Sequence, residues 1–354
     1  MTSGDDVIPC IEMLTAAAAD RGVASLAVIE RSGTEPHACW VPESEEEPAF
    51  LAYSITKTFT AALILQLRDE KRIALDAPLS RWFPRVDRAD RISIRQLLNH
   101  TAGIPDYGRV HAYHESVKST PESPWSFDKF AMETFDRGLA FEPGSGWAYS
   151  NPGYMLLKRI AEEVAGAPLA TLVAERIARP VGLRRTFVAE SIEDLATLAA
   201  GTSCALSPDG APRDVRTTYH PGWVSHGVVA STASDVTRFL DALFRGAIVS
   251  RDAIAQMLEL VPVPVDASDT WRAGPPAYGL GVMGSTSSRW GRIAGHNGGG
   301  PCYMASAFHA LDLGGATVCA MGAIESGFDA EHLVFDVLDR FGTVQGRSEQ
   351  EGAV

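Results

Sequence analysis

The pattern of apolar residues predicts a buried helix over 58–68. No proline or glycine interrupts this stretch, and its apolar residues recur at helical spacing: Phe59, Ala62, Leu63 and Leu67. The wider stretch 55–67 is apolar nearly all round, broken only by threonines, Lys57 and Gln66. A helix that is apolar on every side belongs in a protein interior. We therefore expect this helix to lie inside the fold.

Shorter apolar runs near the two ends of the chain predict β-strands over 23–30 and 317–324. Two weakly alternating stretches, 292–294 and 303–308, predict another pair of strands around a glycine-rich turn. The middle of the chain, 80–200, is richer in helical patterns. The chain is thus expected to combine helices and strands.

The predicted buried helix begins next to a serine and a lysine, Ser54-Ile-Thr-Lys57. Serine is a favoured helix cap, and a residue three positions later projects from the same face. Burial and the positive end of the helix dipole both disfavour a charged ammonium. Lys57 could therefore accept the proton of Ser54, as a base paired with a nucleophile. The alternative is that Ser54 merely caps the helix and Lys57 extends to solvent.

A second copy of the same spacing, Ser126-Phe-Asp-Lys129, has a different context. The residues after Ser126 predict an amphipathic surface helix that ends at Gly138. Ser126 is expected to cap that helix. Ser54 is the better candidate for a nucleophile.

Tyr149-Ser-Asn151 lies in a stretch, 141–154, whose glycines and prolines predict a loop. Tyr149 could add a phenol to the proton relay beside Lys57. Asn151 carries an amide that could orient the lysine or a substrate carbonyl. The alternative is an ordinary loop with a buried tyrosine.

His296-Asn-Gly298 opens the glycine-rich segment between the two later strands. Glycines let a ligand or another backbone approach closely. The N–H of Gly299 could join that of Ser54 in an oxyanion hole. We predict that His296, Asn297, Gly298 and Gly299 bind substrate, with His296 as a polar or cationic contact. The alternative is a hairpin turn with a surface histidine.

Taken in order, these three motifs resemble those of the serine β-lactamase-like superfamily. The branch concerned includes class C β-lactamases, D-alanyl-D-alanine carboxypeptidases, D-aminopeptidases and related esterases. The segments 97–104, 143–154, 227–235 and 278–281 are also similar to family segments, so that the resemblance covers roughly residues 20–340.

The resemblance implies an α+β fold (an α/β sandwich), in which helices flank an antiparallel sheet and a mostly helical subdomain is added. Residues 1–80 and 201–354 would form the α/β subdomain and residues 81–200 the helical insertion, with the active site in the cleft between them. It also implies that loops around the cleft, including 105–125 and 262–277, set specificity.

The sequence departs from the family pattern at two places. Lactamases usually carry Lys-Thr-Gly where this chain has His296-Asn-Gly298, which weakens a lactamase assignment. Cys302 stands where relatives often have glycine, so we expect a narrowed or oxidisable pocket rim. No dedicated deacylating glutamate is identified, so deacylation would use the Tyr149–Lys57 pair.

Composition limits the possible partners. The 354 residues are 45% hydrophobic, and this length exceeds the ~250–300 residues at which single cores tend to split. A net charge of −13 argues against nucleic-acid binding. The acidic run Glu43–Glu47 is expected to be a solvated loop, or else a gate that favours cationic or neutral substrates. The five cysteines show neither a disulfide framework nor a metal motif.

Other chemistries lack their motifs. Gly-x-Ser-x-Gly is absent, and His111 and His114 do not stand in an HExxH frame. No basic and apolar leader opens the sequence, and no run reaches ~18 apolar residues. We therefore expect a cytoplasmic protein with no cofactor, no metal and no membrane contact; the sequence does not predict the oligomeric state.

These observations predict a serine hydrolase that acts through an acyl-enzyme on a small-molecule ester or amide, of the esterase, amidase or D-peptidase type. One alternative is a transacylase that passes the acyl group to an amine or alcohol in natural-product tailoring. The other is a non-catalytic binding or scaffold member of the family.

Overall fold

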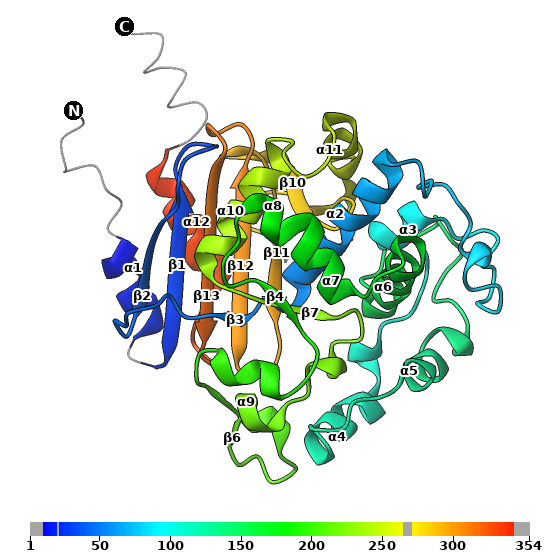
Figure 1. Ribbon diagram of the computed structural model, residues 1–354, viewed down its shortest axis with the longest axis horizontal. Coiled ribbons are helices and arrows are strands. Elements are labelled where there is room, and N and C mark those ends of the chain that lie inside the picture. The colour runs from blue at the N-terminus through cyan, green and yellow to red at the C-terminus, as the bar shows by residue number, and fades with distance from the viewer. Residues whose placement is uncertain (1–9, 20, 265–270, 343–354) are drawn as a thin grey trace, which may run out of the picture.

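A large antiparallel sheet forms the centre of the computed structural model, which describes residues 10–19, 21–264 and 271–342 (Figure 1). Its eight strands follow the order β2-β1-β13-β12-β11-β10-β9-β8. Their bounds are β1 (Val23–Ile29), β2 (His37–Val41), β8 (Val261–Pro262), β9 (Ala277–Tyr278), β10 (Met283–Ser288), β11 (Gly291–Gly299), β12 (Tyr303–Ala310) and β13 (Ala316–Ala323). The expected α+β class is confirmed.

Strands from the two ends of the chain lie side by side in this sheet. Val23 of β1 stands opposite Ala323 of β13, and Ile29 stands opposite Thr317. The strands predicted over 23–30 and 317–324 are each confirmed to within a residue or so. The first and last parts of the chain therefore build one sheet.

Both faces of the sheet are covered by helices. In β13, Val318 and Ala320 pack in one core with α1 (Cys10–Ala18) and α12 (Ala330–Arg340), whereas Cys319 and Met321 belong to the core of α10 (Ala233–Phe244). This alternation is the period of two that a strand imposes on its side chains. Figure 1 shows the resulting layers, with the sheet between helices.

The helix predicted over 58–68 is α2 (Thr56–Asp69), and it is buried over nearly its whole length. The ring of Phe59 stacks on Phe239 of α10, with 3.7 Å between the ring centres. The start of the helix differs from the expectation, because Ser54 lies in a 3₁₀ turn, Tyr53–Ile55, and caps nothing. Its hydroxyl is therefore available for other contacts.

Most of the remaining helices lie beyond the edge of the sheet that is opposite to β2 (Figure 1). They are α3 (Ile94–Leu98), α4 (His111–Ser119), α5 (Phe127–Glu133), α6 (Asn151–Ala165), α7 (Leu169–Val173), α8 (Arg179–Val181), α9 (Val215–Thr218) and α11 (Arg251–Met257). Two small sheets complete the fold: β3 (Phe50–Leu51) with β7 (Val228–Ser231) and β4 (Phe187–Ala189), and β5 (Thr202–Ser203) with β6 (Arg213–Asp214). The division into two subdomains at residues 80 and 200 stays a prediction.

The second Ser-x-x-Lys segment is structural, as predicted. Ser126 caps α5 by accepting a hydrogen bond from the Lys129 N–H at 3.2 Å. Lys129 Nζ bonds to Glu133 one turn later.

Among the described helices, none is long and apolar enough to cross a lipid bilayer.

Candidate active site

Ser54 lies where the two other predicted catalytic residues converge. Lys57 Nζ is 3.1 Å from Ser54 Oγ, and the Tyr149 hydroxyl donates to the same oxygen at 2.7 Å. The 3₁₀ turn and the first turn of α2 place the serine and the lysine. Tyr149 comes from the loop before α6, 95 residues further along the chain. The structure thus brings the three residues together.

Lys57 is fully buried, with an exposed fraction of 0%, so the alternative that it extends to solvent is wrong. Besides Ser54, its Nζ contacts Asn151 Oδ1 at 2.7 Å and His226 Nε2 at 3.1 Å. Burial lowers the pKa of Lys57 well below its ordinary value, and the carboxylate of Asp106 opposes this shift in part. This shift favours the neutral amine, which is the form that can accept a proton.

The pKa of Tyr149 is shifted in the opposite direction to that of Lys57. Burial raises the pKa of its phenol well above the ordinary value, although the hydrogen bond to Ser54 opposes this shift. The phenol consequently keeps its proton near neutral pH. In this site the tyrosine is a proton donor to Ser54 Oγ, and the lysine is the group that can act as a base.

Asn151 is the first residue of α6 and not part of a loop. The helix begins here because Ser150 caps it, accepting from the Gly153 N–H at 3.0 Å, and because proline is tolerated in a first helical turn. The loop predicted over 141–154 is therefore wrong for its last four residues. The Asn151 N–H donates to Asp106 Oδ1 at 2.8 Å, which fixes the amide beside Lys57.

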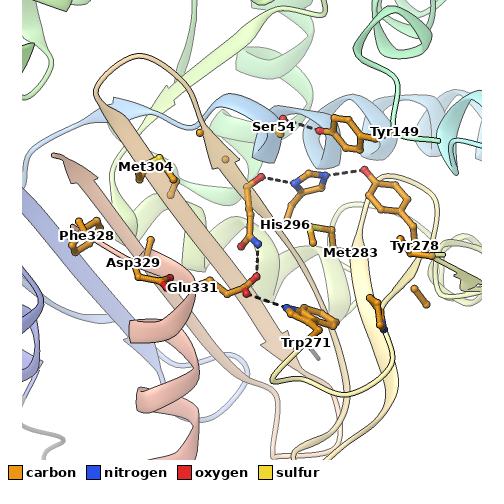
Figure 2. A pocket seen from close by; sticks show the side chains of 18 of the residues that line it. Ser54, Tyr149, Trp271, Tyr278, Met283, His296, Met304, Phe328, Asp329 and Glu331 are labelled. Carbon is orange, nitrogen blue, oxygen red and sulfur yellow. Dashed lines mark hydrogen bonds between the residues drawn. The ribbon is translucent and has the colours of Figure 1, made fainter. Parts of the chain in front are cut away.

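His296 lies in strand β11 and is 2% exposed, so the alternative of a turn with a surface histidine is wrong. Burial, together with the smaller repulsion that Lys57 exerts when it is protonated, lowers the pKa of His296 to about 3, and the ring is neutral rather than cationic. Its Nδ1 lies 2.5 Å from the Asn297 carbonyl oxygen, which can only accept. Nδ1 thus carries the ring proton, and Nε2 accepts from the Tyr278 hydroxyl at 2.8 Å (Figure 2).

The glycines after His296 bring strand β11 against the serine turn. A Cβ on Gly298 would lie 2.2 Å from the Ala52 carbonyl oxygen and 3.4 Å from the Ser54 nitrogen. The Gly300 N–H donates to the Tyr303 carbonyl at 3.2 Å. Because such bonds alternate along an antiparallel pair, the Gly299 N–H is directed away from β12, toward the edge where Ser54 lies.

The sequence alone does not single out three further residues of this site, of which His100 and His226 are buried. Asp106 and His226 act on Lys57, and the ring of His100 lies 4.4 Å from that of Tyr149. His100 and His226 fall in or next to segments that resemble the family, but no spacing links them to Lys57, because His226 is 169 residues away. Only the fold brings them together.

The expected narrowing of the pocket rim by Cys302 is wrong. Cys302 is buried and its Sγ packs against Gly201, so it does not narrow the rim; its φ of +69° is a conformation that favours glycine. The acidic run 43–47 is mostly exposed, as expected of a solvated loop, and it lines neither cavity next to Ser54, so the alternative of a gate is wrong. Its last member, Glu47, instead accepts from Ser25 and from the Ser234 N–H.

Two cavities meet at Ser54 and Gly299. The larger, of about 810 Å³, includes Tyr149 and His296, and the smaller, of about 360 Å³, includes Asn151 and His226. Parts of the loops 105–125 and 262–277 line them, which agrees with the role the resemblance implies; residues 265–270 lie outside the described part of the chain.

This fold and these motifs place the chain among known proteins. The family model "Beta-lactamase" matches residues 12–320, so the chain belongs to the beta-lactamase family. Penicillin-binding protein 4* of Bacillus subtilis is 31% identical over 271 residues, which is 73% of this chain and 57% of that protein. The D-aminopeptidase of Gluconobacter oxydans is 28% identical over 264 residues, 71% of this chain and 44% of that protein. The chain spans about half the length of these curated relatives.

Solved structures match over nearly the whole chain. A D-stereospecific amidohydrolase from Streptomyces sp. superposes with a TM-score of 0.80 and 28% identity, covering 94% of this chain and 97% of its own. The D-amino acid amidase of Ochrobactrum anthropi SV3, in complex with D-phenylalanine, gives a TM-score of 0.76 and 25% identity, covering 93% and 96%.

Proposed function

We propose that this chain is a serine hydrolase that cleaves a small-molecule ester or amide through an acyl-enzyme. The observation that carries the proposal is the continuous contact from the Tyr149 hydroxyl through Ser54 Oγ to Lys57 Nζ, at 2.7 and 3.1 Å. A serine hydroxyl needs a base within hydrogen-bond reach to become nucleophilic. Lys57, whose pKa is lowered by burial, meets this requirement.

Acylation then follows from the positions of these groups. Lys57 takes the proton of Ser54 while Oγ attacks the acyl carbon. The N–H groups of Ser54 and Gly299 hold the oxyanion that forms. Tyr149 gives its phenolic proton to the departing oxygen or nitrogen, and the proton held by Lys57 replaces it. Water, activated by the same pair, then attacks the acyl-enzyme and releases the acid.

The magnitudes expected of these roles are large. A general base typically contributes ~10²–10⁴ in rate, and one oxyanion donor contributes ~10²–10³. Asn151 and His226 hold Lys57 in place, whereas His296 orients Tyr278 at the wall of the larger cavity. The Streptomyces amidohydrolase and the Ochrobactrum amidase support an amide substrate by the reactions that their names give.

Two alternatives share the scaffold. A transacylase would admit an amine or alcohol in place of water, and the 810 Å³ cavity beside Tyr149 has room for such an acceptor. Analysis of products with and without acceptors separates the two reactions. A non-catalytic member would not need Lys57 buried against Ser54, and the assembled contacts therefore favour an enzyme.

The test is covalent labelling followed by intact-protein mass spectrometry. Wild type, Ser54→Ala and Ser126→Ala are incubated with a fluorophosphonate and with p-nitrophenyl acyl esters, and p-nitrophenol release is followed in parallel. Ser126 is the matched control because it heads the second Ser-x-x-Lys segment yet only caps α5.

We expect one adduct on wild type and on Ser126→Ala and none on Ser54→Ala, whose fold should be unchanged by circular dichroism. Turnover retained by Ser54→Ala, or no adduct on any of the three proteins, would overturn the proposal.

A further inference from the structure

The larger cavity lies on the leaving-group side of Ser54. Ser54 and Gly299 line both cavities, so the scissile carbonyl belongs where the two meet. Tyr149 lines only the larger cavity, and Asn151 only the smaller. Because Tyr149 donates the proton that the leaving atom receives, the leaving group must extend into the larger cavity and the acyl chain into the smaller one.

The leaving-group cavity is wide and mostly apolar. Its volume of about 810 Å³ is typical of a site for a drug-sized molecule and far exceeds the need of ammonia or methanol. Aromatic rings and methionines supply a large part of its wall: Trp147, Trp271, Tyr278, Met283, Met304 and Phe328. Figure 2 shows several of these side chains around the space below Ser54 and Tyr149. Such a wall fits a leaving group with a bulky apolar or aromatic body.

The far end of this cavity is negatively charged. Asp329 and Glu331 stand at the first turn of α12 and line it (Figure 2). Neutral donors hold both: the Trp271 indole and the Asn297 amide donate to Glu331, and the His332 N–H donates to Asp329 at 2.9 Å. Among the described residues, no lysine or arginine forms an ion pair with either carboxylate.

Among the described residues, no cationic side chain lines the same space. The described residues of the lining include neither lysine nor arginine, and His296 is neutral because burial lowers its pKa. The Arg21 guanidinium bonds to the Gly327 carbonyl, at the outer rim. The start of α12 adds a partial positive charge of about half a unit, which two full carboxylates outweigh.

We propose, on the basis of the function proposed above, that the substrate's leaving group is an alcohol or amine with an apolar or aromatic body and a cationic end. The cation lies between the two carboxylates and the aromatic wall, where charge attraction and cation–π contact both favour it. A leaving group that carries a carboxylate is rejected. The site therefore suits esters and amides of cationic alcohols or amines rather than substrates with a free carboxylate at this end.

The experiment compares three aryl butyrates that differ only in the leaving phenol. Its para substituent is trimethylammoniomethyl, the isosteric neopentyl, or carboxymethyl. Each kcat/KM is divided by the rate of hydroxide-catalysed hydrolysis of the same ester, which removes differences in intrinsic reactivity. Fluorophosphonate labelling of Ser54 is measured on every protein used, so that the serine chemistry is scored separately.

Glu331→Gln is the diagnostic variant. Asn297 Oδ1 is buried without a hydrogen-bond partner among the described residues, so the Asn297 amide can turn and accept from the new glutamine amide. The variant should therefore fold. Asp336→Asn is the matched control, because it removes the same charge from the same helix at a residue that lines a different cavity.

In wild type and in Asp336→Asn, we expect the cationic ester to exceed the anionic one by about 10- to 100-fold in corrected kcat/KM. Glu331→Gln should reduce this ratio at least threefold. Normal labelling with equal rates for the three esters, or with the anionic ester fastest, would overturn the leaving-group inference and leave the serine chemistry intact. No labelling and no turnover would overturn both.

Discussion

Nε2 of His226 lies 3.1 Å from Lys57 Nζ, as the third polar group around the amine. A neutral amine has two N–H groups and one lone pair. If Asn151 Oδ1 and His226 Nε2 each accept a hydrogen bond from one N–H group of Lys57, the lone pair of the amine faces Ser54 Oγ. Burial lowers the pKa of His226 well below its ordinary value, so the ring is neutral and can accept. His226 is thus a positioning residue for the base.

Removal of this acceptor should slow the chemical step more than it weakens binding. We expect His226→Phe to lower kcat about tenfold, the worth of one hydrogen bond to a charged or reacting group, while KM changes less than twofold. His226→Gln, which restores an acceptor, should recover part of the loss. Steady-state kinetics on the best ester gives both constants. Equal losses in the two variants would show that the ring only fills space.

Asp106 should set the pH at which Lys57 becomes active. The carboxylate raises the pKa of Lys57, against the larger lowering by burial. Without the negative charge the ammonium is less stable, so Asp106→Asn lowers the pKa of the lysine further. The acid limb of the kcat/KM profile should then move to lower pH. A shift toward higher pH, measured with a neutral ester, would contradict the assignment of Lys57 as the base.

The sequence predicted the parts of this site that local patterns determine. The apolar stretch after Ser54 determines a buried helix, and one helical turn then fixes the lysine beside the serine. Tyr149 and Asn151 were found because their motif has a recognisable order relative to Ser54. Even there, the loop predicted from the sequence extends four residues too far, because the cap by Ser150 and the tolerance for Pro152 outweigh the turn signal.

The rest of the site depends on packing between distant segments. No local sequence pattern indicates that His226 and Asp106 lie near Lys57, or that His296 is buried and hence neutral. The expected hairpin turn at His296 was wrong because β11 continues through Gly299 and packs against the serine turn. Burial, which decides the charge of each of these groups, is a property of the whole fold.

Gly298 should not tolerate a side chain, whereas Gly299 should tolerate one. A Cβ on Gly298 would meet the Ala52 carbonyl at 2.2 Å, a backbone atom that cannot move without displacing Ser54. On Gly299 it would meet only the flexible end of Met304, at 3.2 Å. Gly298→Ala should lower the melting temperature by several degrees and reduce acylation at least tenfold, whereas Gly299→Ala should melt within about two degrees of wild type. Similar melting temperatures for the two variants would contradict the close approach of β11 to the serine turn.

Buried neutral histidines should make the protein sensitive to mild acid. Burial lowers the pKa of His296 to about 3 and that of His309 to about 4, and it also lowers those of His100 and His226. In the unfolded chain each titrates near 6.5. Between the lowered pKa of each histidine in the folded state and about 6.5, the unfolded state binds more protons than the folded state. The free energy of unfolding therefore falls as the pH falls through this range.

His309 allows this to be tested away from the active site. Its ring stacks on Phe244 and bonds to Thr317, and it lines neither cavity beside Ser54. Its lowered pKa corresponds to about 2 kcal/mol of unfolding free energy that is present at pH 7 and lost at pH 5. His309→Gln cannot take up a proton in this range, so its difference in unfolding free energy between pH 7 and pH 5 should be about 2 kcal/mol smaller than that of wild type. Urea unfolding at the two pH values measures the difference. If the variant loses as much stability as wild type, His309 is not held neutral by the fold.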